Sequence, residues 1–287
     1  MIEGVWLPII TPFLNDHVDF PALKKMVEHY IDKGIYGFMP LATTGEIPTI
    51  DELEYEEIIA QIVEYVNGRV PIFVGCGGND TRRLVKQLKI VEKYKVNGIL
   101  SVCPFYNRPS QEGIYEHFRK ISEATDLDIV LYNIPYRTGI NMENETIYRL
   151  AELKNIIGLK DSCGDTKQSM QLLLNRPENF SVLTGEDCFF YNSLALGGNG
   201  GIMASAHIET EKFIALYAAM KNNDHHAAMK KWHDVVDLIS LLFTESNPMP
   251  IKYVLYRAGL IHSDEARLPL IPISAQLKKK LDQVVGR

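Results

Sequence analysis

Several features are scarce in this sequence of 287 residues, and each scarcity narrows the kind of protein it encodes. The four cysteines, Cys76, Cys103, Cys163 and Cys188, form no CxxC pair and no Cys/His metal spacing, so we expect free, reduced thiols. No apolar run approaches the ~18 residues of a membrane span. The N-terminus lacks a basic segment followed by a small-residue cleavage site, so we expect no secretory signal and a cytoplasmic location.

The sequence also has fewer basic than acidic residues, 30 against 36. The formal net charge is −6, and the longest basic block is Lys278-Lys279-Lys280, so we expect neither nucleic acid nor an anionic lipid surface as a partner. No two histidines stand with a carboxylate at metal spacing, and the glycine-rich segment 197–201 lacks the Lys-Ser/Thr of a P-loop. We therefore expect no metal and no cofactor.

The sequence does contain a regular alternation of two patterns. Short apolar runs recur eight times, and segments of helical period such as 20–33, 51–66 and 80–94 separate them. The runs are continuous rather than alternating, which is typical of parallel strands buried on both faces. Eight such units in about 200 residues predict an α/β protein with a closed (β/α)8 barrel, the TIM barrel. The predicted strands are Val5–Thr11, Gly37–Leu41, Val70–Gly75, Gly98–Cys103, Ile129–Tyr132, Ile156–Lys160, Ser181–Thr184 and Gly200–Met203.

The end of the chain has a different character. From about residue 226 only helical patterns follow, over 229–242, 250–258 and 274–284. We therefore predict a catalytic barrel over residues 1–225 and a C-terminal helical subdomain over 226–287. Asn79 or Asp80 and Thr49 are the residues expected to cap two of the barrel helices.

In a barrel, catalytic residues lie at the carboxyl ends of the strands, and Lys160 ends the sixth predicted strand. Burial there would lower the pKa of its amine and leave a neutral nucleophile able to form an imine with a carbonyl compound. The alternative is a lysine that extends to solvent and pairs with Asp161 or Asp187. The position of Lys160 on the strand leaves both interpretations open.

Three further groups at strand ends have both a functional and a structural interpretation. Tyr132 ends the fifth strand, where its phenol could move protons during imine formation or could simply be a satisfied buried hydroxyl. The Thr43-Thr44-Gly45 turn could bind a carboxylate through hydroxyls and backbone N–H groups, or could be an ordinary loop. Arg137 could bind a second carboxylate or make a surface ion pair with a glutamate.

At these positions the sequence resembles the dihydrodipicolinate synthase/N-acetylneuraminate lyase family of class I aldolase-like barrels. The similarity covers essentially the whole chain, and its most specific pieces are TTGE at 43–46, YNIPYRTG at 132–139 and GLKDS at 158–162. The resemblance implies that Lys160 binds pyruvate as an imine. It implies that Tyr132 donates and accepts protons and that Thr44 and Tyr106 complete the proton relay, Tyr106 from a neighbouring subunit.

The resemblance also implies the substrate contacts and the assembly. Thr43 and Thr44 are expected to hold the pyruvate carboxylate, with Gly185 and Ile202 contributing to the substrate site. Arg137 resembles the arginine with which the synthase branch of the family binds the carboxylate of L-aspartate 4-semialdehyde. The expected activity is thus a Schiff-base condensation of pyruvate with that aldehyde in diaminopimelate and lysine biosynthesis. The expected assembly is a homotetramer built from two dimers.

Two other functions remain open at this point. The first is a 2-oxo-acid aldolase that cleaves a sugar acid of the N-acetylneuraminate or 2-keto-3-deoxygluconate type, with Glu186, Asp187 and Ser205 binding hydroxyls. The second is a catalytically silent barrel that binds small acids.

Feedback inhibition by lysine is the last property that the resemblance addresses, because many synthases of the family bind lysine between paired subunits. The residues at the matching positions differ here, and an arginine in place of a carboxylate would repel the lysine ammonium. We therefore expect weak or absent inhibition by lysine. The altered positions are Pro48, Glu52, Tyr55, Arg83 and Phe105, whereas Asn79 is retained.

Overall fold

The structure, a computed structural model, describes residues 1–285. It divides into two compact units, which are described separately. The first unit comprises residues 1–4 and 72–202, and the second comprises residues 5–71 and the chain from Met203 onward. This grouping by compactness does not test the predicted boundary after residue 225, which stays a prediction.

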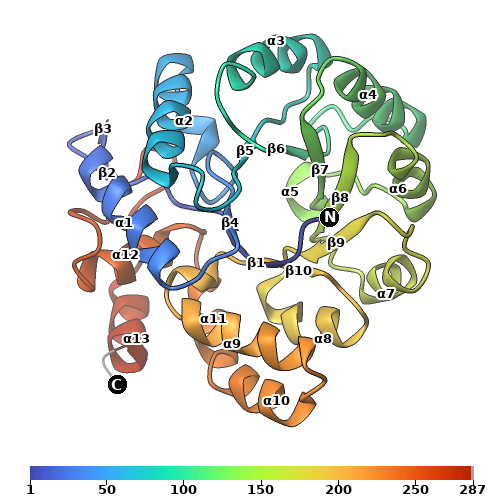
Figure 1. Cartoon of the computed structure of the whole chain (residues 1–287). Helices are drawn as coiled ribbons and strands as arrows, with labels where there is room; N and C mark the ends of the chain where they lie inside the picture. The colour runs from blue at the N-terminus through green and yellow to red at the C-terminus, as the bar shows by residue number, and fades with distance from the viewer. Residues whose placement is uncertain (286–287) are drawn as a thin grey trace. The chain divides into compact units, whose positions relative to one another are not determined.

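The first unit contains six parallel strands, each hydrogen-bonded to the next in the order β10-β9-β8-β7-β6-β5. Helices follow the strands and lie on the outside of the sheet, as α3, α4, α6 and α7 do in Figure 1. The strands are β5 (Phe73–Gly75), β6 (Gly98–Val102), β7 (Asp128–Asn133), β8 (Ile156–Asp161), β9 (Ser181–Thr184) and β10 (Gly200–Ile202). The helices are α3 (Thr81–Val91), α4 (Gln111–Glu123), α5 (Pro135–Thr138), α6 (Asn144–Ala151), α7 (Thr166–Leu174), the 3₁₀ turn η2 (Asp187–Phe189) and α8 (Phe190–Ala195).

The second unit holds the beginning and the end of the chain. Its strands β1 (Gly4–Leu7, of which Val5–Leu7 belong to this unit) and β4 (Gly37–Phe38) pair in parallel, and a short antiparallel hairpin precedes the first helix. The hairpin strands are β2 (Phe13–Leu14) and β3 (His17–Val18). The helices are α1 (Phe20–Asp32), α2 (Glu52–Val66), α9 (Thr210–Lys221), α10 (His225–His233), α11 (Val236–Leu242), α12 (Met249–Arg257) and α13 (Ala275–Val285), with 3₁₀ turns η1 (Ile47–Thr49) and η3 (Ser205–His207).

The eight predicted strands all occur, although most differ from their predicted bounds by one to four residues at an end. Three local predictions were wrong. The hairpin β2–β3 was missed, and the helix predicted over 229–242 is two helices with a break at Asp234 and Val235. The cap of α2 is Asp51 rather than Thr49, because Asp51 and Glu54 form a reciprocal capping box. Asp80 does cap α3, through its carboxylate and the backbone N–H groups of Arg82 and Arg83.

The four cysteines are free thiols, as predicted. None of the helices in the described part of the chain has the length and apolar character needed to cross a bilayer.

Candidate active site

Lys160 and Tyr132 face each other on neighbouring parallel strands of the first unit. The register of β7 and β8 pairs these two residues directly, so both side chains leave the sheet at the same level. Each is 5% exposed, and the Lys160 Nζ lies 4.4 Å from the centroid of the Tyr132 ring. An amine and a phenol are thus held together in a buried setting at the carboxyl ends of two strands.

The surroundings of Lys160 favour its neutral form. Burial lowers the pKa of Lys160 to about 8, while the nearby carboxylates of Asp187 and Glu186 oppose this shift and Arg137 adds to it. At pH 7 an amine of pKa 8 is roughly 9% neutral, against ~0.03% for an ordinary lysine. No ion pair with Asp161, one of the two partners considered above, is found within residues 1–285, and that carboxylate accepts hydrogen bonds from the Cys163 backbone N–H and from a serine hydroxyl instead.

Tyr132 has the opposite protonation behaviour. Burial raises the pKa of its phenol well above the usual range, and the neighbouring Tyr136 and Glu186 raise it further, against the effect of Arg137. The phenol therefore keeps its proton near neutral pH. In this state it is a proton donor within the same pocket as a partly neutral amine.

Glu186 follows β9 and adds a carboxyl group to this cluster. Burial and the adjacent Asp187 raise the pKa of Glu186 to about 7, while Lys160 and Arg137 oppose that shift. Its Oε1 atom is buried and has no hydrogen-bond partner among the described residues. The sequence suggested Glu186 only as a group that might bind a sugar hydroxyl, whereas the structure places it in the electrostatic surroundings of the lysine.

Gly185 is the position where backbone must pass close to the lysine. A Cβ atom there would lie 2.5 Å from Lys160 Cε, which is too short for a non-bonded contact, so any side chain at this position would clash with the lysine. Glycine at this position therefore leaves room for the stem of Lys160. Ile202, at the end of β10, is buried with 1% of its surface exposed.

Arg137 lies in the last turn of α5 and is exposed. Its guanidinium lies 5.5 Å from the centroid of the Tyr136 ring, and no salt bridge of Arg137 with a carboxylate is found within residues 1–285. The predicted alternative, a surface ion pair with a glutamate, therefore does not occur in the described part of the chain. The fork of N–H donors remains available for an anion from solution.

The turn at 43–46 belongs to the second unit and is tightly built. Thr44 is 3% exposed, and its Oγ1 accepts a 3.0 Å hydrogen bond from the side-chain amide of Asn247. The Gly45 carbonyl accepts a 2.8 Å hydrogen bond from the hydroxyl of Thr11. Thr43 is half-buried. The contact with Asn247, the first residue of the segment Asn-Pro-Met-Pro-Ile-Lys at 247–252, was not predicted.

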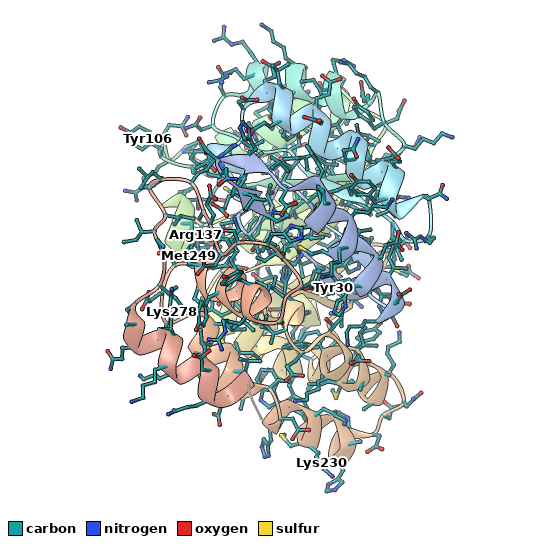
Figure 2. The ribbon with its side chains drawn as sticks, turned by 90° about the vertical axis from the view of Figure 1, so that its left-hand side faces the viewer. Tyr30, Tyr106, Arg137, Lys230, Met249 and Lys278 are labelled. Atoms are coloured by element: carbon teal, nitrogen blue, oxygen red, sulfur yellow. The ribbon has the colours of Figure 1, made fainter. Side chains whose placement is uncertain are left out.

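Tyr106 projects from the surface of the first unit, as Figure 2 shows. It is 89% exposed and has a left-handed backbone with φ of 70°, and the preceding Phe105 is 39% exposed. Two neighbouring exposed aromatic side chains are unusual on a protein that does not associate.

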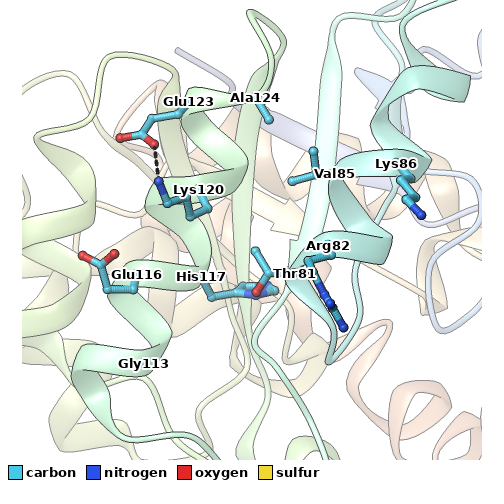
Figure 3. A pocket seen from close by; sticks show the side chains of 10 residues that line it. All are labelled: Thr81, Arg82, Val85, Lys86, Gly113, Glu116, His117, Lys120, Glu123 and Ala124. Atoms are coloured by element: carbon cyan, nitrogen blue, oxygen red, sulfur yellow. Dashed lines mark hydrogen bonds and ion pairs between the residues drawn. The ribbon is translucent and has the colours of Figure 1, made fainter.

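A separate groove lies between α3 and α4 (Figure 3). It has a volume of about 700 Å³, with the Val85 and His117 side chains among its lining residues. The Glu116 and Glu123 carboxylates beside it are already engaged by Arg119. The Nε2 atom of His117 is buried and has no hydrogen-bond partner among residues 1–285. No set of three His, Cys, Asp or Glu side chains arranged for a metal ion occurs in the part of the chain described.

The amino-acid sequence and the fold of this chain are similar to those of the same family of known proteins. All of residues 1–287 match the family described as "Dihydrodipicolinate synthetase family". The chain is 57% identical over 282 residues to 4-hydroxy-tetrahydrodipicolinate synthase 2 of Clostridium acetobutylicum, covering 98% of this chain and 99% of that protein. The crystal structure of dihydrodipicolinate synthase from Thermotoga maritima matches with a TM-score of 0.97 and 36% identity, over 100% of this chain and 98% of that one.

A third relative is known in a complex. The chloride-inhibited dihydrodipicolinate synthase from Acinetobacter baumannii, complexed with pyruvate, matches with a TM-score of 0.96 and 35% identity over 100% of this chain and 98% of that chain. These full-length matches confirm the predicted fold, a (β/α)8 barrel with a helical C-terminal segment.

Proposed function

Because this chain belongs to the dihydrodipicolinate synthetase family, we propose that it condenses pyruvate with L-aspartate 4-semialdehyde to 4-hydroxy-tetrahydrodipicolinate. It is a carbon–oxygen lyase of the class I aldolase-like type, acting in the diaminopimelate route to lysine. The observation that supports the chemistry best is the buried amine of Lys160, with a pKa of about 8, beside the phenol of Tyr132. Cleavage of a sugar acid, the alternative considered above, is not favoured by the relatives.

In the proposed reaction the neutral Nζ of Lys160 attacks the C2 carbonyl of pyruvate to give a carbinolamine. Loss of water then gives the imine, and loss of a proton from the pyruvate methyl group gives the enamine. The enamine carbon forms a bond to the aldehyde carbon of the second substrate. The pKa of Lys160 supports the first step, because a measurable fraction of the amine is unprotonated near pH 7.

Tyr132 is proposed as the group that supplies and removes protons in these steps. Its high pKa favours the donor form, and its ring contact with Lys160 puts the phenol close to the reacting nitrogen. Thr44 and Tyr106 are proposed to complete the proton relay. The exposure of Tyr106 supports its donation to a neighbouring subunit.

The remaining proposed residues bind substrate. The Thr43-Thr44 turn is proposed to hold the pyruvate carboxylate, with Gly185 and Ile202 shaping the site. Arg137 is proposed to bind the carboxylate of L-aspartate 4-semialdehyde, which its exposed guanidinium, without an ion pair to a carboxylate within residues 1–285, supports.

Assembly and location complete the proposal. The exposed Phe105 and Tyr106 support a dimer as the smallest active unit, and we propose a homotetramer made of two such dimers in the cytoplasm. We further propose that the helices of residues 226–287 act as a subdomain appended to the barrel.

Weak inhibition by lysine is proposed as well. The side chain of Arg83 is exposed, and the amide of Asn79 donates to the Phe105 carbonyl oxygen over 3.2 Å. A cation at position 83 would oppose the binding of another cation nearby. Lysine added to the enzyme assay is expected to have no effect at micromolar concentration, and inhibition in that range would contradict this part of the proposal.

The test of the proposed function combines trapping and turnover. The protein is incubated with pyruvate, reduced with borohydride and digested, and mass spectrometry locates the adduct. L-Aspartate 4-semialdehyde is then added, and product formation is followed with dihydrodipicolinate reductase as the coupling enzyme. We expect a pyruvate adduct on Lys160 and turnover in the coupled assay.

The other outcomes are distinct. An adduct without turnover would retain the imine chemistry but overturn the assignment of the aldehyde, and would direct attention to sugar acids. The absence of any adduct would overturn the proposed function.

A further inference from the structure

We infer that Asn247 is a positioning residue for Thr44 and fixes the direction in which the Thr44 hydroxyl gives its proton. This inference rests on the proposed role of Thr44 in the proton relay. It assigns a function to the Asn-Pro-Met-Pro-Ile-Lys motif at 247–252, which lies about 200 residues from Thr44 in the sequence but in the same compact unit.

The hydrogen bond between the two side chains is the first piece of evidence. The Nδ2 of Asn247 donates to Oγ1 of Thr44 over 3.0 Å. The Oδ1 of the same amide is buried and has no partner in the described part of the chain. The side chain of Asn247 therefore has one hydrogen bond, and that bond is to Thr44.

A hydroxyl group has one proton and two acceptor sites. The amide N–H of Asn247 donates to one of the two acceptor sites on the Thr44 oxygen. The Thr44 hydroxyl therefore cannot donate its own proton to that amide nitrogen. The proton is left to point away from Asn247. A threonine that could otherwise also donate to Asn247 is thus held as a donor whose proton is directed away from that amide, as a proposed member of a proton relay requires.

A second contact from the same motif fixes the backbone that carries Thr44. Glu46, two residues further along, has a left-handed backbone with φ of 56°, which a residue with a side chain rarely adopts. Its carboxylate forms an ion pair with Lys252, and both side chains are completely buried. The Lys252 Nζ also donates to the Glu265 carbonyl oxygen over 2.8 Å. The unusual backbone at Glu46 is therefore held from outside the turn.

The spacing of the motif matches the spacing of the turn. Asn247 stands two residues before the start of α12 and contacts residue 44, whereas Lys252 lies in the first turns of α12 and contacts residue 46. The N-terminal end of α12 and the residues just before it thus contact the turn at two positions. Asn247 holds the hydroxyl of Thr44, and Lys252 holds the backbone at Glu46 through its ion pair.

The test uses two substitutions at position 247 in the full-length protein. Asn247→Asp keeps the shape of the side chain but removes the N–H donor, so Thr44 must turn its proton toward the carboxylate. Asn247→Ala removes the constraint and lets the hydroxyl rotate. Ser246→Asp is the matched control, because it adds the same charge at the exposed neighbouring position.

The measurements are the rate of imine trapping on Lys160 with borohydride, kcat in the coupled assay, and the KM for pyruvate. We expect Asn247→Asp to lower the trapping rate and kcat by about 10²-fold and Asn247→Ala by about 10-fold, with smaller changes in KM. The control should retain the rates of the unchanged protein.

The pH profile distinguishes positioning from simple support of the fold. A protonated aspartic acid is again a donor, so the rate of Asn247→Asp relative to the unchanged protein should recover as pH falls. The buried Glu46–Lys252 pair and the backbone N–H of Arg267 on Glu46 also lie at this turn. They are present in all variants, and the ratio of rates therefore removes their contribution.

Equal rates in all variants, or equal losses in Asn247→Asp and Asn247→Ala with no recovery at low pH, would overturn the inference. A urea unfolding curve for each variant identifies losses that come from unfolding alone, which would also overturn it. If the unchanged protein gives a pyruvate adduct and only the Asn247 results fail, the proposed function stands. If the unchanged protein gives no pyruvate adduct, both the proposed function and the inference about Asn247 are overturned.

Discussion

Lys160 in the first unit and Lys252 in the second are the same residue type in similarly buried positions, with 5% and 0% of their surfaces exposed. Burial lowers the pKa of both. Lys252, however, forms an ion pair with Glu46, donates to a backbone carbonyl and lies 4.3 Å from the centroid of the Phe13 ring. The Nζ of Lys160 faces the ring of Tyr132 instead.

The difference shows that burial alone does not make a lysine a nucleophile. A buried ammonium with a carboxylate and a carbonyl oxygen in contact is held as a charged, structural group. A buried amine next to a phenol, whose pKa the nearby carboxylates raise only in part, is partly neutral, which is the state that the proposed imine chemistry needs. Four predictions test this contrast.

The largest expected effect comes from removing the reactive lysine. Lys160→Ala should lower turnover by ~10³-fold or more and abolish the pyruvate adduct, because Lys160 is the residue proposed to form the imine. Its free energy of unfolding should not fall below that of the unchanged protein, since a poorly solvated amine is removed. Mass spectrometry after borohydride reduction, the coupled assay and urea unfolding measure these quantities. Lys86→Ala, at an exposed position, is the control.

Removing the structural lysine, Lys252, should mainly lower the free energy of unfolding. Lys252→Met leaves the carboxylate of Glu46 buried without a counter-charge, so we expect a loss of about 3–5 kcal/mol in the free energy of unfolding. The double variant Glu46→Gln/Lys252→Met should lose less, because neither charge remains. Urea denaturation checks both values, and a single variant as stable as the unchanged protein would show that the pair does not hold the turn.

A substitution at Arg137 should affect the binding of the aldehyde substrate but not the reaction with pyruvate. Arg137→Ala is expected to raise the KM for L-aspartate 4-semialdehyde by roughly 10- to 100-fold, as expected for the loss of a charge-assisted hydrogen bond. The rate of pyruvate trapping on Lys160, measured well above the pKa of that lysine so that the charge of Arg137 does not affect it, should stay close to that of the unchanged protein. Steady-state kinetics with each substrate varied in turn measure this, and an equal effect on both substrates would contradict the assignment of Arg137 to the aldehyde.

The smallest effect concerns pH. Since burial lowers the pKa of Lys160 to about 8, the trapping rate should rise with pH and level off above that value. The carboxylate of Glu186 favours the protonated amine, so Glu186→Gln should shift the midpoint to lower pH by up to about 1 unit. A midpoint that moves to higher pH, or stays near the usual lysine value in the unchanged protein, would contradict this account of the lysine.

The strands were predictable because their residues carry a local signal. Continuous apolar runs at regular intervals indicate buried parallel strands, and each of the eight predicted runs overlaps one. The hairpin of β2 and β3 was missed because each strand has two residues, too few for any period to show. The cap of α2 was misplaced because Thr49 and Asp51 are both good capping residues, and only the reciprocal contact with Glu54 decides between them.

Lys160 was identified from its place at the end of a strand and from the surrounding motif, and its side chain indeed lies buried opposite Tyr132. Lys252 was not identified as a buried charge. It stands in an apolar helical segment where a lysine commonly extends to solvent, and its partner Glu46 lies about 200 residues earlier. Nothing in the local sequence indicates that this pair forms.

The order of strands and helices could be predicted from the amino-acid sequence. So could the strand ends at which the candidate catalytic residues stand and the family to which the motifs belong. These properties follow from short-range patterns of apolar and polar residues. The tertiary structure alone decided which of the two buried lysines is paired, how far burial lowers the pKa of Lys160, and that Asn247 contacts Thr44. Those outcomes depend on groups that are distant in sequence and on the exclusion of water, which only the folded chain brings about.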